Sequence, residues 1–149
     1  MEEKDTLFKS KLTKPSQRDK YAPTPAFIGA SWLALLTSIV TYCIGLYNAG
    51  MQLNEKGYYL ALLFFGLFSA VSLQKSVRDK AEDITTTNIY YGICWFALGS
   101  AILLMTIGLY NAGSIVRSEK GFYAMTYVLA LFSAITVQKN VRDLERYKE

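Results

Sequence analysis

Four long stretches of this chain contain no charged residue, and the charges gather between them. The stretches cover residues 21–54, 57–74, 84–116 and 121–138. A helix on a soluble protein keeps a polar face, and none of these stretches has one. Because a helix rises ~1.5 Å per residue, ~20 residues cross the ~30 Å hydrocarbon core of a bilayer. The pattern predicts an all-α, polytopic membrane protein with four transmembrane helices.

An internal repeat organises these stretches. The run Ile44–Gly50 recurs without a mismatch as Ile107–Gly113, and the segments after it recur with one residue added to the second loop. Each copy consists of a span, a short loop, a second span and a basic tail, so each copy returns to the side on which it began. We therefore expect two tandem helical hairpins in the same orientation, related by an axis along the membrane normal. The expected divisions are a mobile cytoplasmic tail (1–24), a first two-helix repeat (25–79), a cytoplasmic linker (80–88), a second repeat (89–143) and a cytoplasmic tail (144–149).

The basic residues indicate the orientation. Thirteen of the 16 Lys and Arg residues lie in the N-terminal tail, in the central linker region and after residue 138, and three lie in the two other loops. Because cytoplasmic loops are enriched in Lys and Arg, both termini are expected in the cytoplasm. Tyrosines are expected to form an aromatic belt at each interface. They are Tyr90 and Tyr91 on the cytoplasmic side, and Tyr47, Tyr58, Tyr59, Tyr110 and Tyr123 on the other side.

Several short motifs recur in the same order in both copies. They are G-L-Y-N-A (45–49 and 108–112), E-K-G-[FY]-Y (55–59 and 119–123), L-F-S-A (67–70 and 131–134) and Q-K-x-V-R-D (74–79 and 138–143). The second copy departs mildly, with residues 114–117 reading S-I-V-R where the first copy reads M-Q-L-N at 51–54. This pattern, from about Ala26 to Asp143, resembles the YiaA/YiaB family of small bacterial inner-membrane proteins, and its two tandem copies resemble the YiaA type. The resemblance implies a multi-pass protein of the bacterial inner (plasma) membrane and no particular chemistry.

Polar residues recur in the two outer loops. They are Asn48, Glu55 and Lys56, and their counterparts Asn111, Glu119 and Lys120. They could form a paired polar pocket, but helix capping explains most of them. Asn54 and Ser118 are expected as N-caps, with the glutamates in the first helical turn. Gly50 and Gly113 are expected in the left-handed conformation that ends the preceding helices.

The basic tails of the two copies are candidate contacts for anionic lipid headgroups. The residues are Lys75, Arg78, Lys139 and Arg142. The alternative is that they complement the helix dipole and fix the topology. Arg78 with Asp79, and Arg142 with Asp143, are expected to add exposed ion pairs worth roughly 0–1 kcal/mol.

Small and hydroxylated residues mark candidate helix-packing faces. They are Gly66, Ser69 and Ala70, and in the second copy Ala130, Ser133 and Ala134. In lipid, helices associate through close packing and hydrogen bonds, so these faces should point toward the bundle centre or toward a partner chain. The alternative is a polar permeation path, for which Thr37, Ser38 and Thr41 give slight support. Cys43 and Cys94 are interpreted as small packing residues.

The composition argues against catalysis. The chain has no His, and the charge-free stretches hold no ionisable Asp, Glu, Lys or Arg of the kind that proton relays and ion-coupled transporters usually keep. We expect no enzymatic activity, no cofactor and no metal. The expected function is a structural or accessory membrane module that self-associates or binds a membrane partner. The alternative is a small channel or transporter for an uncharged solute. Membrane lipid, a second copy or another membrane protein are the expected partners, and nucleic acid is not.

Overall fold

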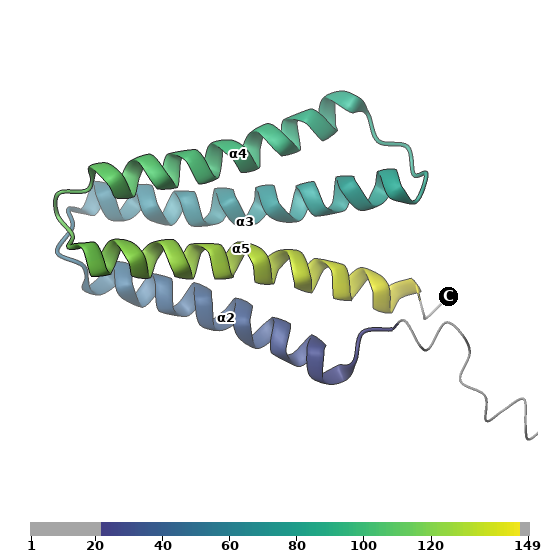
Figure 1. The fold of residues 1–149 in the computed structure, drawn as a ribbon, viewed down its shortest axis with the longest axis horizontal. Helices are drawn as coiled ribbons and strands as arrows, with labels where there is room; N and C mark the ends of the chain where they lie inside the picture. Colours follow the sequence, from purple (N-terminus) through teal and green to yellow (C-terminus); the bar gives the residue numbers. More distant parts are fainter. Residues whose placement is uncertain (1–21, 147–149) are drawn as a thin grey trace, which may run out of the picture.

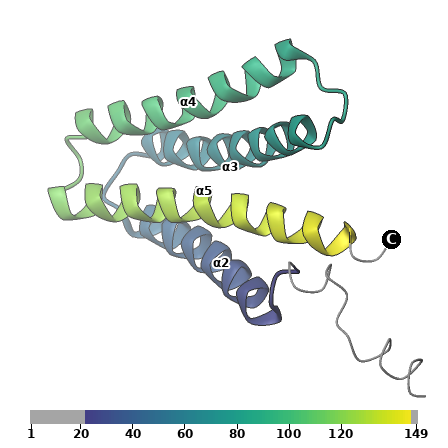
Figure 2. The same cartoon turned by 45° about the vertical axis from the view of Figure 1, so that its right-hand side comes forward.

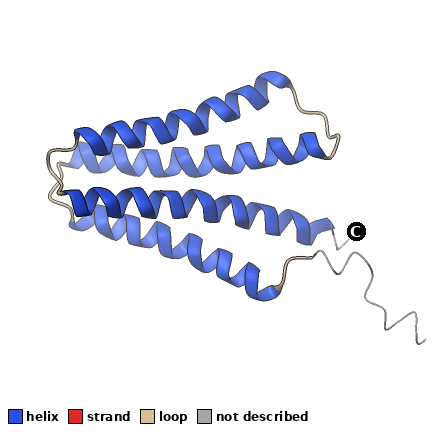
Figure 3. Ribbon diagram, in the orientation of Figure 1, coloured by secondary structure: helices blue, strands red, loops and turns tan. Residues whose placement is uncertain are grey.

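The computed structural model describes residues 22–146 and consists of four helices joined by short loops (Figures 1 and 3). The helices are α2 (Pro25–Asn48), α3 (Leu53–Ala81), α4 (Asn88–Asn111) and α5 (Arg117–Arg146). All four are long and apolar enough to cross a membrane, which confirms the predicted all-α membrane fold. Most of the tail predicted to be mobile, residues 1–21, lies outside the described residues, as do residues 147–149.

The first helix of each repeat begins at a threonine. The Thr24 hydroxyl accepts a hydrogen bond from the Phe27 N–H (3.3 Å), and Pro25 follows at the first helical position. Thr87 does the same for α4, because its hydroxyl accepts from the Tyr90 N–H (3.3 Å). A side-chain oxygen at this position satisfies an N–H group that has no partner within the helix.

The predicted N-caps of α3 and α5 are wrong by two residues. Helix α3 begins at Leu53 and is capped at Gln52, whose N–H donates to Glu55 Oε2 (3.0 Å). Glu119 Oε2 accepts from the Val116 N–H in the same way (2.9 Å). A glutamate that reaches back to the cap in this way stands three residues after it, so Asn54 and Ser118 fall inside the helices. Both glutamates do lie in the first turn, as expected.

The left-handed conformation predicted for Gly50 and Gly113 is also wrong. Among the described residues no glycine has a positive φ, and Ala49 leaves α2 in an extended conformation. The Tyr47 and Tyr110 carbonyls near the ends of α2 and α4 accept hydrogen bonds from Lys56 and Lys120 instead. Asp83 in the α3–α4 linker does adopt a left-handed conformation, at φ 56°, which aspartate tolerates better than most residues.

Two central helices carry most of the packing. Helices α3 and α5 lie side by side, α2 packs along α5, and α4 packs along α3 (Figures 1 and 2). By contrast, α2 touches α3 only slightly, and α4 touches α5 only slightly, although each of these pairs is one sequence repeat. The packing units therefore cross the repeat boundary.

The two repeats point in the same direction. Loops α2–α3 and α4–α5 lie at one end of the bundle, which we call the loop end (Figure 1). The α3–α4 linker, the start of α2 and the end of α5 lie at the other end, which we call the terminal end. Contacts also recur in matched pairs, which is what a two-fold relation between the repeats produces. Gly45 lies against Phe122, and the equivalent Gly108 lies against Tyr58.

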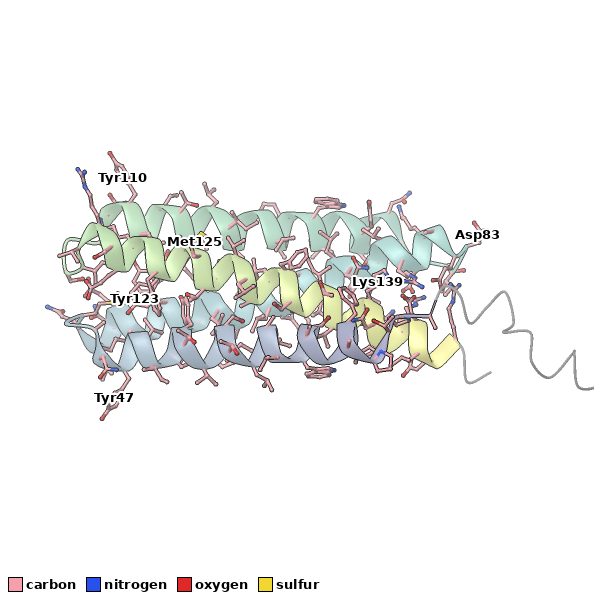
Figure 4. The ribbon with its side chains drawn as sticks, turned by 60° about the horizontal axis from the view of Figure 1, so that its bottom comes forward. Tyr47, Asp83, Tyr110, Tyr123, Met125 and Lys139 are labelled. Carbon is pink, nitrogen blue, oxygen red and sulfur yellow. The ribbon has the colours of Figure 1, made fainter. Side chains whose placement is uncertain are left out.

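Tyrosines fill the core near the loop end. Tyr42, Tyr59, Tyr123 and Tyr127 are all buried and their rings pack against one another. The prediction that Tyr59 and Tyr123 belong to an interfacial belt is therefore wrong, because both side chains point inward. Tyr47 and Tyr110, which were also predicted for the belt, are each 84% exposed and project on opposite sides of the loop end (Figure 4).

Candidate functional site

The six polar residues predicted in the outer loops all take part in ending or starting helices. The side-chain amide of Asn48 donates to the Ile44 carbonyl (2.9 Å), and Lys56 Nζ donates to the Tyr47 carbonyl (2.9 Å). The second repeat reproduces both bonds, with Asn111 on Ile107 (3.0 Å) and Lys120 on Tyr110 (3.2 Å). With Glu55 and Glu119 reaching back to their caps, each residue has a capping role.

A hydrogen bond between two side chains joins the two repeats at the loop end. Ser114 Oγ donates to Glu55 Oε1 (3.4 Å), using the carboxylate oxygen that the cap leaves open. A shallow cavity of about 260 Å³ lies beside it, bordered by Glu55, Tyr58 and Asn111. Glu55, Tyr58 and Asn111 already make hydrogen bonds within the bundle.

The terminal end holds a cluster of ion pairs between α3 and α5. Arg142 Nη1 lies 2.6 Å from Asp79 Oδ1, and Arg78 pairs with Asp143 in the reciprocal position. Each aspartate also pairs with the lysine four residues before it, Lys75 or Lys139, at 2.8 Å. Figure 4 shows Lys139 at this end of the bundle. The expectation that Arg78 and Arg142 pair with the adjacent aspartates is wrong, since both arginines reach across to the other repeat.

Glu82 breaks the symmetry of this cluster. It follows the last residue of α3 and accepts from Arg78 Nε (2.5 Å) and Arg142 Nη2 (2.8 Å), while Arg146 Nη2 lies 3.2 Å away. The residue at the equivalent place in the second repeat, 64 positions later, is Arg146. One carboxylate thus binds three guanidinium groups. The repeat motifs did not predict this cluster because Glu82 lies in the linker, outside them.

These ion pairs lie beyond the charge-free stretches, which end at Gln74 and Gln138, and they shift the titration of the carboxylates. The hydrogen bond from Lys75, supported by Arg142, lowers the pKa of Asp79 below its usual value. The hydrogen bond from Arg78, supported by Arg142, lowers the pKa of Glu82. Nearby cations favour the charged form, and here they outweigh the opposing effect of burial.

Acid is expected to weaken the terminal end. A carboxylate whose pKa is lower in the folded state stabilises the fold above its unfolded-state pKa and loses that contribution as the pH falls through the folded value. With unfolded values of about 3.9 for Asp and about 4.3 for Glu, thermal stability in detergent should hold from pH 7 to about 5 and fall below about 4. The double variant Asp79→Asn, Glu82→Gln should show a flatter profile. Equal slopes in the two proteins would show that the cluster does not contribute.

The four predicted headgroup contacts divide into two kinds. The side chains of Arg78 and Arg142 are only 18% and 19% exposed because they are held between α3 and α5. Those of Lys75 and Lys139 are 58% and 52% exposed and hold only the aspartate on their own helix. Contact with a lipid headgroup stays a prediction, and of the four residues Lys75 and Lys139 are the ones exposed enough to make it.

The six small and hydroxylated residues predicted as packing faces are all buried in α3 and α5. The hydroxyls of Ser69 and Ser133 donate to carbonyls of their own helices, Phe65 (2.6 Å) and Leu129 (2.6 Å), so they do not join helices by hydrogen bonds. Tyrosines make those bonds. Bonds to another helix's backbone run from Tyr42 to Tyr59 (2.9 Å), from Tyr58 to Leu104 (2.7 Å) and from Tyr127 to Leu62 (3.1 Å).

A buried polar pair near the terminal end was missed by the sequence analysis. Asn140 on α5 is 1% exposed, and its amide donates to Ser31 Oγ on α2 (3.0 Å), while its own Oδ1 has no hydrogen-bond partner. The equivalent contact pairs Ser76 Oγ with Cys94 Sγ (3.4 Å). The signal was present as a mismatch in the repeat, because Ser76 aligns with Asn140 and Ser31 with Cys94.

A lateral groove opens between α4 and α5. Its volume is about 320 Å³, and its walls are aliphatic and aromatic apart from Thr106. Ile102 and Met105 line one side, and Val128 and Phe132 line the other. The groove exists because these two helices touch so little.

Comparison with known proteins now places the chain. The model of the yiaA/B two helix domain matches residues 27–79 and again residues 90–143. The chain belongs to this family. It is 56% identical over 120 residues to the inner membrane protein YiaA of Escherichia coli (strain K12), a match that covers 80% of this chain and 82% of that protein. It is 38% identical over 68 residues to the uncharacterized membrane protein YubF of Bacillus subtilis (strain 168), covering 45% of this chain and 78% of that protein. No solved structure matches.

Membership of the YiaA/B family confirms the resemblance predicted from the motifs and gives the location. The chain is a multi-pass protein of the inner membrane with two copies of the two-helix domain. The family's domain boundaries coincide with α2–α3 and α4–α5, the helix pairs that share a loop but little packing. Among the described residues, no group of three His, Cys, Asp or Glu side chains is placed to hold a metal ion.

Proposed function

We propose that this protein is a non-enzymatic structural or accessory module of the inner membrane that binds a membrane partner or a second copy of itself. One observation carries the proposal. In the described part of the chain, six loop-end residues and the terminal-end ion pairs are engaged in capping helices or in joining the repeats; the six are Asn48, Glu55, Lys56, Asn111, Glu119 and Lys120. The polar chemistry of the molecule serves its architecture.

The same reasoning sets the proposed orientation. The terminal end carries the basic tails, and the loop end carries only Lys56, Arg117 and Lys120. Lys and Arg are enriched on the cytoplasmic side, so we place the terminal end in the cytoplasm. A membrane-impermeant thiol label tests this placement on variants that lack Cys43 and Cys94 and carry a single cysteine near the N-terminus or near the C-terminus. Labelling of either terminus from outside intact spheroplasts would contradict it.

The core argues against a pore for uncharged solutes. The Ser38 hydroxyl is buried and donates to the Leu35 carbonyl (2.8 Å), and Thr41 donates to the Thr37 carbonyl (2.5 Å). Thr37 itself is exposed on the outside of α2. The bundle centre is filled by side chains such as Tyr42 and Leu63, both 0% exposed. A hydrogen-bonding path for a solute would need free hydroxyls facing one another, and these hydroxyls face their own helices.

The groove between α4 and α5 is the surface that we assign to a partner. It lies at the depth of the spans and is open from the side, so a partner helix could pack into it without unfolding this chain. In lipid such packing is driven by close fit, which an existing groove offers and a smooth helix face does not.

Site-specific photocrosslinking in cells tests the proposal. A photoreactive residue in place of Ile102 or Val128 in the groove should yield a discrete protein adduct, whereas the same residue in place of Leu33, which faces away from the bundle, should not. If the groove positions yield adducts with lipid alone, the proposal that a protein binds in the groove is wrong. Liposomes with purified protein test the alternative, because solute flux that is abolished by Thr41→Leu would favour a channel.

A further inference from the structure

Each repeat finds most of its packing on the other repeat. Helix α2 packs on α5 and α4 packs on α3, while the two helices within a repeat barely touch. Such an interlaced pair resembles a dimer of two-helix units whose chains have been joined. In a molecule with two similar halves, each half can fit the other half better than it fits a copy of itself. Three pairs of equivalent positions hold different side chains in the two repeats and create such a difference.

The first unequal pair lies between the central helices. Tyr127 of α5 rests on Gly66 of α3, and its hydroxyl donates to the neighbouring Leu62 carbonyl (3.1 Å). A Cβ atom at position 66 would overlap the Tyr127 hydroxyl and lie only 2.8 Å from the ring carbon that bears it. The equivalent positions hold the opposite combination, a smaller Leu63 with a larger Ala130, both fully buried. A large side chain thus packs on a glycine in one place, and the two-fold relation between the repeats matches it with Leu63 and Ala130 in the other.

The second unequal pair is polar and lies closer to the terminal end. Asn140 of the second repeat donates to Ser31 of the first (3.0 Å), and Ser76 of the first meets Cys94 of the second (3.4 Å). If a second repeat paired with its own copy, Asn140 would face Cys94. A thiol accepts hydrogen bonds weakly, so the buried amide N–H would lose its good acceptor, while the Asn140 Oδ1 already lacks a donor.

The third unequal pair meets where the repeats face each other near the loop end. Tyr42 and Met105 occupy equivalent positions, and their side chains touch, with Tyr42 Oη 3.9 Å from Met105 Sδ. Both are buried. A pair of first repeats would bring two tyrosines to this place, and a pair of second repeats would bring two methionines and leave the tyrosine's volume unfilled.

We propose that these pairs make the inter-repeat surface selective. The surface of the first repeat, built around Gly66, is a docking surface for a two-helix unit of the second-repeat type, and neither repeat pairs equally well with itself. Two second repeats would press Tyr127 against Ala130, reproducing the overlap that a Cβ at Gly66 creates. Two first repeats would set Leu63 over Gly66 and leave a cavity.

The experiment uses the full chain, cut after it has folded. A protease site is inserted between Thr85 and Thr86 in the α3–α4 linker, and each end of the chain carries a different affinity tag. After purification in mild detergent and cleavage, capture of the second repeat should retain the first repeat in equal amount. When two cleaved preparations with distinguishable tags are mixed and allowed to exchange, new complexes should contain one repeat of each type. Capture of second repeat by second repeat to the same extent would overturn the proposal.

Two variants test the packing of Tyr127 on Gly66. Gly66→Ala should lower retention of the first repeat by about tenfold or more, because overpacking of this size is destabilising. Adding Tyr127→Leu to Gly66→Ala should restore retention, since it recreates the Leu63 and Ala130 combination already present in the molecule. The matched control is Gly99→Ala on α4, where a Cβ would meet nothing within 4 Å, and it should change nothing. Retention that survives Gly66→Ala, or that the second change fails to restore, would refute this role of Gly66.

Discussion

Replacing Arg142 by glutamate is expected to destabilise the protein strongly. Arg142 holds Asp79 at 2.6 Å and Glu82 at 2.8 Å, so the substitution removes both pairs and sets a third negative charge beside two carboxylates. Loss of one partner of a largely buried ion pair leaves the other charge without compensation. We expect a loss of unfolding free energy on the order of 2–3 kcal/mol. Thermal unfolding of the purified protein in detergent measures it.

The control is the same substitution at the opposite end of the bundle. Arg117 is exposed at the start of α5, where the helix dipole favours the negative charge of a glutamate. Arg117→Glu should therefore change stability by no more than about 0.5 kcal/mol. If both variants unfold at the same temperature, the terminal-end cluster is not holding α3 and α5 together.

Truncating Leu63 to alanine is the second change with a large expected effect. Leu63 is fully buried in the core cluster, so the substitution leaves a cavity between the central helices. In a soluble protein the cost combines transfer from water with the cavity itself, but separated helices in a membrane expose leucine to lipid tails and not to water. Only the packing part remains, and we expect about 1–3 kcal/mol. Resistance to unfolding in a series of denaturing detergent mixtures measures it.

A leucine that faces away from the bundle provides the comparison. Leu33 on α2 is 68% exposed, so Leu33→Ala exchanges one lipid contact for another and should have little effect. An effect at Leu33 as large as that at Leu63 would mean that this face of α2 is covered by a partner in the sample. The oligomeric state of the purified protein would then show whether that partner is a second copy of the chain.

The sequence was informative wherever a property depends on one segment alone. Four charge-free stretches predicted four spanning helices, and the exact run Ile44–Gly50 with its copy predicted the repeat and the family. Glu55 and Glu119 were placed correctly in first turns because the helix dipole acts locally. The predicted N-caps Asn54 and Ser118 were wrong because both residues lie inside their helices. The glutamate that accepts from the cap N–H stands three residues after the cap, which places the caps at residues 52 and 116.

Features that depend on which segments meet could not be predicted in the same way. Arg78 has Asp79 beside it in the sequence, yet it pairs with Asp143, and Tyr59 and Tyr123 look like interfacial residues, yet they lie in the core. The sequence pattern did not predict a role for Asn140, because a single amide residue after a span is compatible with many environments. Its importance appears only when α2 is packed against α5.

The sequence by itself determined that this chain lives in lipid, crosses it four times and is built from two like-oriented copies, since backbone hydrogen bonding and the lack of a polar face leave no other stable arrangement. Only the tertiary structure decided that the copies interlace. Lipid surrounds every span equally well and supplies no preference for one neighbour over another. The neighbours are set by close packing at Gly66, by the hydroxyls of Tyr58 and Tyr127 and by the reciprocal ion pairs, all of which act between the two repeats.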